Sequence, residues 1–591
     1  MTKFAKNSRL FHNENIGYTF MTQIIKYTIC IALLTIILLC PAGSMAQSID
    51  SQFPKHEVRA VWLTTISGLD WPKKQVRSAT DIEKQKKELI VILDNLKKAN
   101  INTVLFQTRI RGSVVYPSAI EPWDICLTGT SGKSPGYDPL RFAVEECHKR
   151  GMEAHAWIVC IPVGKWNSPA CKALRRKYPS MISRDKEEGY INPANTQAAT
   201  YISGICTEIV KNYDVDGIQL DYIRYPETIK MKEPKAKARE NITRIVRSVY
   251  ADVKSIKPWV KISCSPIGKL KDLSRYSSRG WNAFNRGYQD VEGWMKEGIM
   301  DQVYPMMYFK GNNFHPFAID WKERSNGRTI VGGLGTYQLA PSQANWDMAE
   351  VQRQLHTLRA IGAGHAHFRS RFLTDDTKGI YRYTSDAFNP YPALVPPMTW
   401  QGSETPVTPS HLKAETGDDC TSLTWSYDKN IREERIKYNV YASADWPVDT
   451  ENPKNIISIG LDKPQITLPF GNDDRSMYYA VTAVNRYGIE SKPCQSHEKA
   501  TDAKATSISA PYITIEESVI STKKYMSKVL DAEYIVVESL EGNQLMTFPF
   551  KGQDISTAGI NDGIYILRSL NRKGVSHRLG FILIDKQNII H

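Results

Sequence analysis

The sequence predicts an α/β protein, a (β/α)8 TIM barrel followed by two small all-β sandwich domains, and three observations support this prediction. Between residues 55 and 395, short runs of β-branched and aromatic residues alternate eight times with amphipathic stretches. A polar linker with several prolines then covers residues 396–408. Beyond it the pattern contains only short strands and turns. Ordinary glycine and proline contents, with 41% hydrophobic residues, exclude fibrous and disordered classes of protein.

Strand-like and helix-like segments alternate in the order that builds a parallel barrel. We expect the strands at residues 58–65, 102–108, 152–159, 217–222, 260–265, 302–308, 329–334 and 364–369. Thr80 and Glu83 predict a capping box that opens the first helix. Further helices are expected at 140–149, 198–213, 238–256, 288–297 and 347–361. No G-x-G-x-x-G motif follows the first strand, which argues against an open dinucleotide-binding sheet.

Residues 1–46 are predicted to be a secretory signal peptide. Lys26 precedes the apolar run 27–40, and Ser44 and Ala46 supply a small-residue cleavage site. The run is shorter than the roughly 20 residues that a bilayer-spanning helix needs, so we expect no stable transmembrane anchor. The protein is therefore expected to be exported and to be periplasmic, cell-surface or extracellular.

The charge and the cysteines exclude several classes of function. Without residues 1–46 the net charge falls from +14 to +11, which suits an acidic polymer, and equally a solvated surface of mixed charge. Basic clusters at residues 84–87 and 175–177 lie on helix-like segments without interleaved aromatic residues, so nucleic acid is not an expected partner. No C-x-x-C pair marks a zinc ribbon or a thioredoxin-like redox site. No G-x-S-x-G elbow marks an esterase.

Asp221 is the first candidate catalytic residue, as nucleophile or general base, because reacting groups in a barrel come from the carboxyl ends of strands and the loops after them. Along the fourth strand, side-chain alternation places Gln219 and Asp221 on one face, with Asp221 at the mouth. Asp216 begins the same strand and lies about 16 Å away at 3.3 Å per residue, too far for a glycosidase pair. Asp216 is therefore predicted to be a structural cap at the base. Glu153 is similarly predicted to belong to a buried polar network.

A second carboxylate must come from another loop at the mouth. Asp70 after the first strand and Glu121 after the second are the preferred candidates for the acid. Asp124, Asp375 and Asp376 remain alternatives, and the sequence does not choose among them. The alternative to a catalytic role for Asp221 is a salt bridge with Arg224.

Aromatic and polar residues near the same rim predict a sugar-binding surface, since flat rings stack on sugar faces while polar groups bind hydroxyls. Arg109 suits an anionic group, or else forms an internal ion pair. The expected substrate-binding residues are Gln107, Arg109, Tyr116, Trp123, His155, Trp157, Tyr225 and Tyr308.

A metal centre is the rival chemistry. His365 and His367 have a spacing compatible with a metal site, and His155 is a candidate third ligand. In metal-dependent barrel hydrolases such a pair usually lies on the first strand, where this chain has Trp62, Leu63 and Thr64, and no carboxylate matching a ligand set follows His367. We therefore expect neither a metal nor another cofactor.

Several blocks together resemble the glycosyl hydrolase-like 10 family of exported bacterial proteins. They are EVRAVWLTTISGLDWP from Glu57, the long block from Phe106 to Trp157, VDGIQLDYIRYP from Val215 and VEGWMKEGIMDQVYPMMYF from Val291. The resemblance implies a TIM-barrel glycoside hydrolase whose relatives cleave cell-wall glycans or other polysaccharides. Where the family often has an Asp-Asp pair after the fourth strand, this chain has Asp221 followed by Tyr222. Residues 158–162 also lack the polar Asn and Arg of the family's turn.

The remaining domains carry weaker resemblances. The run 478–491, with Trp425 as the matching core tryptophan, resembles the end of a fibronectin type III domain, so residues 409–500 are predicted to form such a sandwich. Residues 510–591 are predicted to form a C-terminal β-sandwich, with a loose resemblance to a sorting domain. The complete prediction is an exported glycoside hydrolase that acts on a polysaccharide or peptidoglycan glycan strand. The alternative is a non-catalytic carbohydrate-binding barrel.

Overall fold

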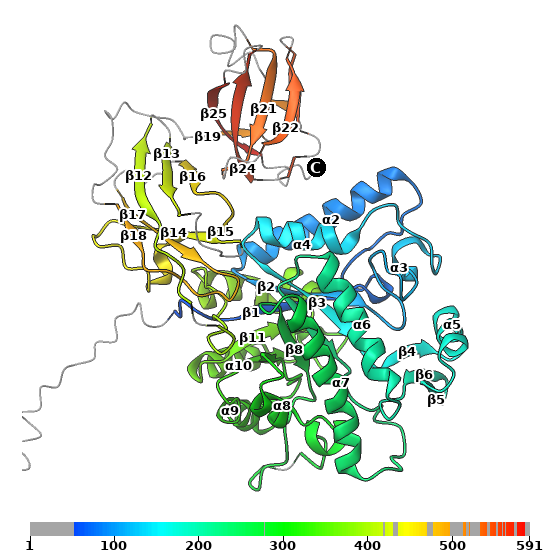
Figure 1. The fold of residues 1–591 in the computed structure, drawn as a ribbon. Helices are drawn as coiled ribbons and strands as arrows, with labels where there is room; N and C mark the ends of the chain where they lie inside the picture. The colour runs from blue at the N-terminus through cyan, green and yellow to red at the C-terminus, as the bar shows by residue number, and fades with distance from the viewer. Residues whose placement is uncertain are drawn as a thin grey trace, which may run out of the picture. The chain divides into compact units, whose positions relative to one another are not determined.

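A closed barrel of eight parallel strands forms the core of the chain (Figure 1). The computed structural model describes residues 53–496, apart from 277, 403, 418–419, 429–434 and 470–476, and separate stretches between 512 and 584. The predicted signal peptide lies outside the described residues. The barrel strands are β1 Arg59–Leu63, β2 Thr103–Arg109, β3 Glu153–Val159, β7 Gly217–Asp221, β8 Lys261–Ser265, β9 Gln302–Val303, β10 Thr329–Leu334 and β11 Gly364–His367. The predicted barrel is confirmed, with a much shorter sixth strand than expected.

The barrel interior is a packed apolar layer, not a pore. Registers between neighbours, such as Trp62 beside Leu105 and Trp157 beside Gln219, bring side chains from different strands to the same height. The interior cluster consists of Val58, Ala60, Trp62, Leu105, Trp157, Val159, Tyr304, Val331 and Ala366. Side chains alternate along each strand. The residues of this cluster therefore identify which other positions of the same strands face the barrel axis.

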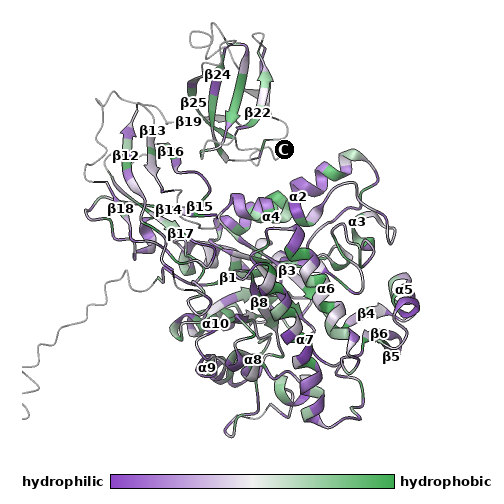
Figure 2. Cartoon of the chain, viewed as in Figure 1, coloured by the Kyte–Doolittle hydropathy of each residue, from purple (hydrophilic) through white to green (hydrophobic). Residues whose placement is uncertain are grey.

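Amphipathic helices cover the barrel and bury their apolar faces against it (Figure 2). The longer ones are α2 Ala79–Lys98, α4 Pro139–Lys149, α6 Gln197–Asn212, α7 Lys235–Ile256, α8 Val291–Glu297, α9 His315–Glu323 and α10 Met348–Ala360, and the short ones include α3 Ile125–Thr128, α11 Ser370–Thr374 and α12 Ile380–Arg382. The capping box of α2 is formed by Ser78 and Asp81, so the prediction of Thr80 and Glu83 is wrong by two residues. Ser78 fits because it accepts from the Asp81 amide while Asp81 accepts from the Ser78 amide.

An insertion between β3 and α6 was not predicted. Residues 162–191, here called the insertion, form β4 Pro162–Lys165, α5 Pro169–Lys177, β5 Ile182–Asp185 and β6 Glu188–Ile191. Its strands pair in the order β4-β6-β5. Gly189 allows this packing, since a Cβ there would lie 2.5 Å from the Cys171 sulfur. Two residues separate the end of β3 from the insertion, so the insertion rises from the carboxyl end of the barrel.

All-β structure follows the barrel. A three-stranded sheet, β12 Ser410–Thr416, β13 Cys420–Ser426 and β16 Gln465–Pro469, shares an apolar core with a four-stranded sheet, β14 Lys437–Ser443, β15 Ile456–Leu461, β17 Tyr478–Val484 and β18 Cys494–Gln495. Trp425 lies in that core, as predicted. The likeness to fibronectin type III stays a prediction.

The last part of the chain has a core of its own, built around Ile535, Val537, Leu567 and Ile582. Its main sheet consists of β19 Tyr512–Ile515, β25 Ser576–Ile584, β24 Gly563–Leu570, β21 Tyr534–Glu538 and β22 Gln544–Pro549, and a second small sheet pairs β20 Val519–Ile520 with β23 Ile555–Ser556. Within the described residues, no helix is long and apolar enough to cross a membrane.

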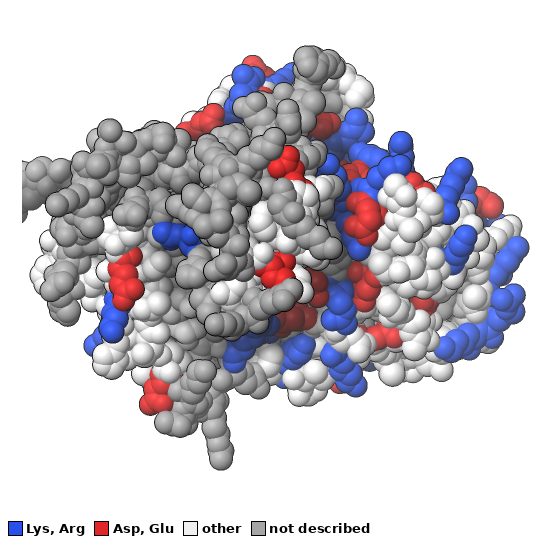
Figure 3. Space-filling model, turned by 90° about the horizontal axis from the view of Figure 1, so that it is seen from above, with Lys and Arg blue, Asp and Glu red and all other residues white. Residues whose placement is uncertain are grey.

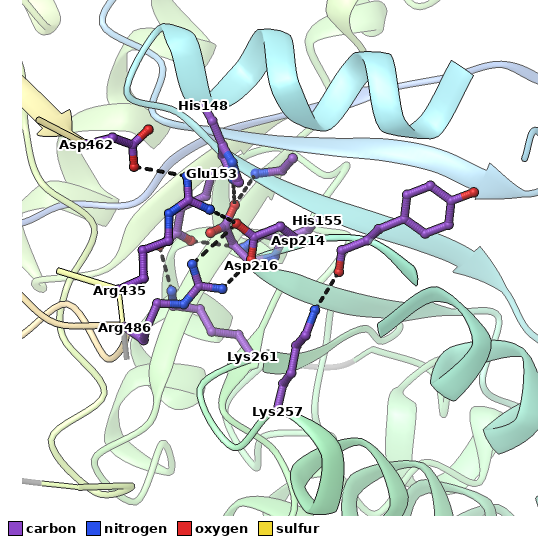
Figure 4. A network of polar contacts seen from close by, with 12 residues as sticks. His148, Glu153, His155, Asp214, Asp216, Lys257, Lys261, Arg435, Asp462 and Arg486 are labelled. Atoms are coloured by element: carbon purple, nitrogen blue, oxygen red, sulfur yellow. Dashed lines mark hydrogen bonds and ion pairs between the residues drawn. The ribbon is translucent and has the colours of Figure 1, made fainter. Parts of the chain in front are cut away.

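A network of charges closes the base of the barrel (Figure 4). Asp216 accepts hydrogen bonds from the Ala154 amide at 2.8 Å and contacts His148 Nε2 at 2.7 Å. Glu153 forms an ion pair with Lys261 at 2.6 Å and contacts His155 at 3.0 Å. The predicted structural roles of Asp216 and Glu153 are therefore confirmed, and both carboxylates lie far from the mouth.

Candidate active site

Asp221 ends β7 and lies at the mouth of the barrel, where only 4% of its surface is exposed. Its Oδ2 accepts a hydrogen bond from Trp157 Nε1 at 3.0 Å, and its Oδ1 accepts one from the Tyr222 amide at 2.8 Å. Trp157 comes from β3, the neighbouring strand, and both side chains point inward because they follow the parity of the interior cluster. The residue from β3 thus binds one oxygen of the Asp221 carboxylate, and the residue that follows β7 binds the other.

Burial raises the pKa of Asp221, since a charged carboxylate is poorly solvated there. The positive charge of Arg224 and the hydrogen bond from Trp157 act in the opposite direction without cancelling the effect. A carboxyl group that keeps its proton to higher pH is suited to general acid catalysis.

Tyr222 and Arg224 complete the surroundings of Asp221, and sequence analysis assigned neither to the site. Tyr222 has a left-handed backbone with φ +48°, a conformation that an aromatic residue rarely adopts and that often marks a functional site. This turn leaves 42% of Tyr222 exposed, with the Arg224 guanidinium 4.2 Å from its ring centre. Arg224 does not form the salt bridge with Asp221 that the sequence offered as the alternative to a catalytic role; it pairs with Glu227 at 2.9 Å.

Glu227 is a carboxylate that sequence analysis missed. It lies in the loop after β7, six residues beyond Asp221, and 28% of its side chain is exposed. The charges of Asp221 and Glu227 each raise the pKa of the Tyr222 hydroxyl, so both carboxylates lie within electrostatic range of the same ring. Its place in a loop after a barrel strand was the available signal.

The structure does not leave Glu121 free to act as the acid. Both of its oxygens bind Arg109, with Oε2 at 2.9 Å from Nε and Oε1 at 2.7 Å from Nη2. Oε1 also accepts from the Tyr201 hydroxyl at 2.6 Å, and neither charged side chain is exposed. The alternative expectation for Arg109, an internal ion pair, is the one observed. Arg109 therefore offers no bidentate face to a substrate.

Asp70 is also committed to the protein. Its Oδ2 accepts from the amide and the hydroxyl of Thr64 at 2.8 and 2.6 Å, and its Oδ1 accepts from Arg369 at 2.5 Å. With 1% of its side chain exposed, Asp70 ties the end of β1 to the loop after β11. Both of its oxygens are occupied by donors from the protein, so its predicted role as the acid is corrected to a structural one.

The remaining predicted binding residues separate into two groups. Trp157 and Tyr308 belong to the mouth: the Tyr308 hydroxyl has no hydrogen-bond partner, and the charge of Asp221 adds to burial in raising its pKa. The others contact protein, as the following partners show. Tyr116 donates to Glu208 at 2.8 Å, Tyr225 accepts from Asn241 at 3.0 Å, Gln107 accepts from the Thr65 and Ile66 amides, Trp123 packs on the main core, and His155 belongs to the base network.

The histidines do not converge on a metal site. Ala366 belongs to the barrel interior, so its neighbours His365 and His367 point outward to the helix layer. His367 Nδ1 lies 3.0 Å from the Thr336 hydroxyl, and the His365 ring lies 5.4 Å from that of Phe388. Burial lowers the pKa of His367 to about 4. Within the described residues, no cluster of three or more His, Cys, Asp or Glu is arranged to hold a metal.

The barrel is similar in sequence to known proteins. The glycosyl hydrolase-like 10 family matches residues 57–238 and 230–334, a region that contains Asp221. Glycosyl hydrolase DigH of Escherichia coli (strain K12) is 31% identical over 307 residues, which are 46% of this chain and 69% of that protein. The chain belongs to the glycosyl hydrolase-like 10 family. Family membership gives it the activity class of a glycoside hydrolase.

This family member is also similar to a second curated protein and to a solved structure. Glycosyl hydrolase YngK of Bacillus subtilis (strain 168) is 29% identical over 427 residues, covering 66% of this chain and 82% of that protein. The glycoside hydrolase domain of PgaB (BpsB) from Bordetella bronchiseptica aligns over 56% of this chain and 98% of that chain, with 14% identity and a TM-score of 0.40.

Proposed function

We propose that this protein hydrolyses O-glycosidic bonds in a polysaccharide or cell-wall glycan, with Asp221 as its central catalytic residue. The observation that carries the proposal is a carboxyl group with a raised pKa at the mouth of a glycoside hydrolase barrel, bonded to Trp157. The leader-like segment at residues 1–46 supports action outside the cytoplasm.

The proposed mechanism assigns different roles to two carboxyl groups. Asp221 is the general acid, because its burial favours the protonated form that must deliver a proton to the leaving oxygen. Glu227 is the second carboxylate, which either attacks the anomeric carbon or activates water. It is the partly exposed acid in the loop that follows Asp221, and it shares Arg224 as a neighbouring charge. Glu227 thus replaces Asp70 and Glu121 as the partner of Asp221. The two roles are also exchanged, because the sequence predicted Asp221 as nucleophile or general base and its partner as the acid.

The aromatic rings at the mouth are suited to hold the sugar. Tyr222 presents an exposed ring next to Asp221, and the Tyr308 hydroxyl is an unpaired donor near the same carboxyl group. Ring faces stack on the apolar faces of pyranose rings, and a hydroxyl binds a sugar oxygen.

Leaving-group dependence tests the two assignments. The Asp221→Asn variant should lose about 10²–10⁴ in rate on glycans while retaining much more activity on aryl glycosides whose leaving group needs no proton. The Glu227→Gln variant should be slow on both substrates and should regain activity with azide, which replaces the missing nucleophile or base. If Glu227→Gln has wild-type rates on both substrates, the second assignment is wrong.

A carbohydrate-binding barrel without turnover is the second candidate. It is favoured by one observation, that both carboxylates predicted to partner Asp221 are held in ion pairs with arginine. Retention on a polysaccharide gel without any release of reducing ends would support this candidate over hydrolysis.

A further inference from the structure

The insertion carries a strong excess of positive charge. Its basic residues are Lys165, Lys172, Arg175, Arg176, Lys177, Arg184 and Lys186, against the acidic residues Asp185, Glu187 and Glu188. Within the described part of the chain, Arg184 is the one of these seven that forms an ion pair, with Glu187 at 3.0 Å. Lysine and arginine side chains gather along the edge on the right in Figure 3, where α5 and its neighbouring strands lie in Figure 1. The other six cations therefore form no ion pair with any residue that the structure describes.

A tryptophan lies among these cations. The guanidinium of Arg175 stacks on the half-buried Trp166 ring at 3.7 Å, and that of Arg184 lies at 5.6 Å. Arg175 Nη2 also donates to the Trp166 carbonyl at 3.2 Å, which fixes its position. The surface thus combines ordered guanidinium groups with an aromatic ring, while Lys172, Arg176 and Lys177 stay exposed.

The insertion borders the site around Asp221. Thr228, in the loop that carries Arg224 and Glu227, donates a hydrogen bond to Asp185 of the insertion. The loop after β2 packs on it as well, since a Cβ on Gly112 would lie 3.1 Å from Leu174. Exposed Arg111 belongs to this loop, and its charge acts on Tyr222. Positive charge therefore continues from the insertion to the rim of the proposed active site.

We propose that the insertion, together with Arg111, binds glycans that carry carboxylate groups, and that such acidic glycans are the substrate class of this barrel. The assignment of acidic glycans as the substrate class rests on the proposed hydrolase function, whereas the binding of acidic glycans by the insertion does not. Carboxylates along a glycan would pair with exposed lysine and arginine side chains and lead the chain towards Asp221. Buried Arg224, whose Nη1 has no hydrogen-bond partner, supplies a further cation beside the reacting sugar.

Affinity electrophoresis in gels containing an acidic glycan tests the binding clause. Polygalacturonate, hyaluronan and peptide-free peptidoglycan strands serve as probes, each beside its carboxyl-reduced form, which keeps the linkages and loses the charge. The variant is Lys172→Gln with Lys177→Gln, both exposed on α5. The matched control is Lys98→Gln with Lys211→Gln, exposed in the last turns of α2 and α6 and therefore at the opposite end of the barrel.

We expect at least one acidic probe to bind more tightly than its reduced form, with an affinity that falls as salt is added. The α5 variant should bind it about fivefold more weakly, since an exposed ion pair contributes up to about 1 kcal/mol, while the control binds as the wild type does. Equal binding of acidic and reduced forms would overturn the inference. Equal loss of glycan affinity in the α5 variant and in the control would also overturn it. An affinity for poly-glutamate equal to that for the acidic glycan would do the same.

Turnover separates the two proposals. Selective binding of acidic glycans without hydrolysis of any acidic or neutral glycan would support the proposed binding surface. It would contradict the proposed hydrolase function. A protein that hydrolyses neutral glycans as fast as acidic ones supports the hydrolase and contradicts the assigned substrate class.

Discussion

Trp157 donates its indole N–H to Asp221 across 3.0 Å, and this bond joins the ends of β3 and β7 at the barrel mouth. The bond stabilises the charged form of the carboxyl group and so limits how far burial raises its pKa. Two adjacent strands thereby set both the position and the acidity of the same group.

Trp157→Phe removes this hydrogen bond while keeping an aromatic ring. The pKa of Asp221 should then rise further, because burial still acts and one stabilising bond is lost. With Asp221 as the general acid, the alkaline limb of the profile of kcat/KM against pH should move to higher pH. An unchanged or lower apparent pKa for that limb would contradict the assignment. Val159→Ala, also in the barrel interior, is the control for a change in packing.

Asp221→Asn should stabilise the fold at neutral pH. A raised pKa means that the folded state binds the proton more tightly than the unfolded chain, so its stability falls as pH rises from about 4 through the folded pKa. The uncharged variant avoids this loss, and a gain of about 1 kcal/mol in the free energy of unfolding at pH 7 is expected. Urea denaturation at pH 7 and pH 4 measures it, and the gain should shrink at pH 4. A loss of stability at pH 7 would show that the charge is well solvated.

Glu121→Gln should lower the free energy of unfolding, because Glu121 has a structural role and not a catalytic one. It leaves Arg109 buried without its charge partner, which costs about 3–5 kcal/mol of unfolding free energy. The double variant Arg109→Met with Glu121→Leu should lose less, because no charge is left buried. If Glu121→Gln keeps wild-type stability and loses turnover, Glu121 is catalytic and its structural role is wrong.

Asp216→Asn tests the base of the barrel. Burial opposes the ionisation of Asp216, but His148, Lys437 and Lys261 hold its pKa well below the ordinary value. Its contribution to stability is therefore complete above about pH 4 and is lost as pH falls through the folded pKa. The variant should be less stable than the wild type at pH 7, with a difference that narrows below pH 4 in urea denaturation. A difference that stays constant down to pH 3 would contradict the linkage.

Sequence periodicity was sufficient to predict the barrel and to separate the carboxylates at its mouth from those at its base. The twofold alternation along β7 separated Asp221 from Asp216, because 3.3 Å per residue fixes how far apart two strand positions lie. The same argument placed Glu153 at the base. These predictions depend on strand geometry alone, which is regular and local.

The pairing of loop residues required the three-dimensional structure. Glu121 and Arg109 are twelve residues apart, and only the return of the loop after β2 brings them together. Asp70 and Arg369 come from opposite ends of the barrel sequence and meet because the barrel closes. The insertion was missed because each of its strands has four residues and its helix has nine, and segments this short do not establish a period. Glu227 was missed although it lies in a loop after a barrel strand, because the turn that brings it to Arg224 has no sequence signature.

The most direct test of the central claim is the release of reducing ends from acidic and neutral glycans by the wild type and by Asp221→Asn. The account predicts release by the wild type and a rate lower by about 10²–10⁴ in the variant, which should remain folded. Full turnover by Asp221→Asn would contradict the claim that this carboxyl group carries the reaction.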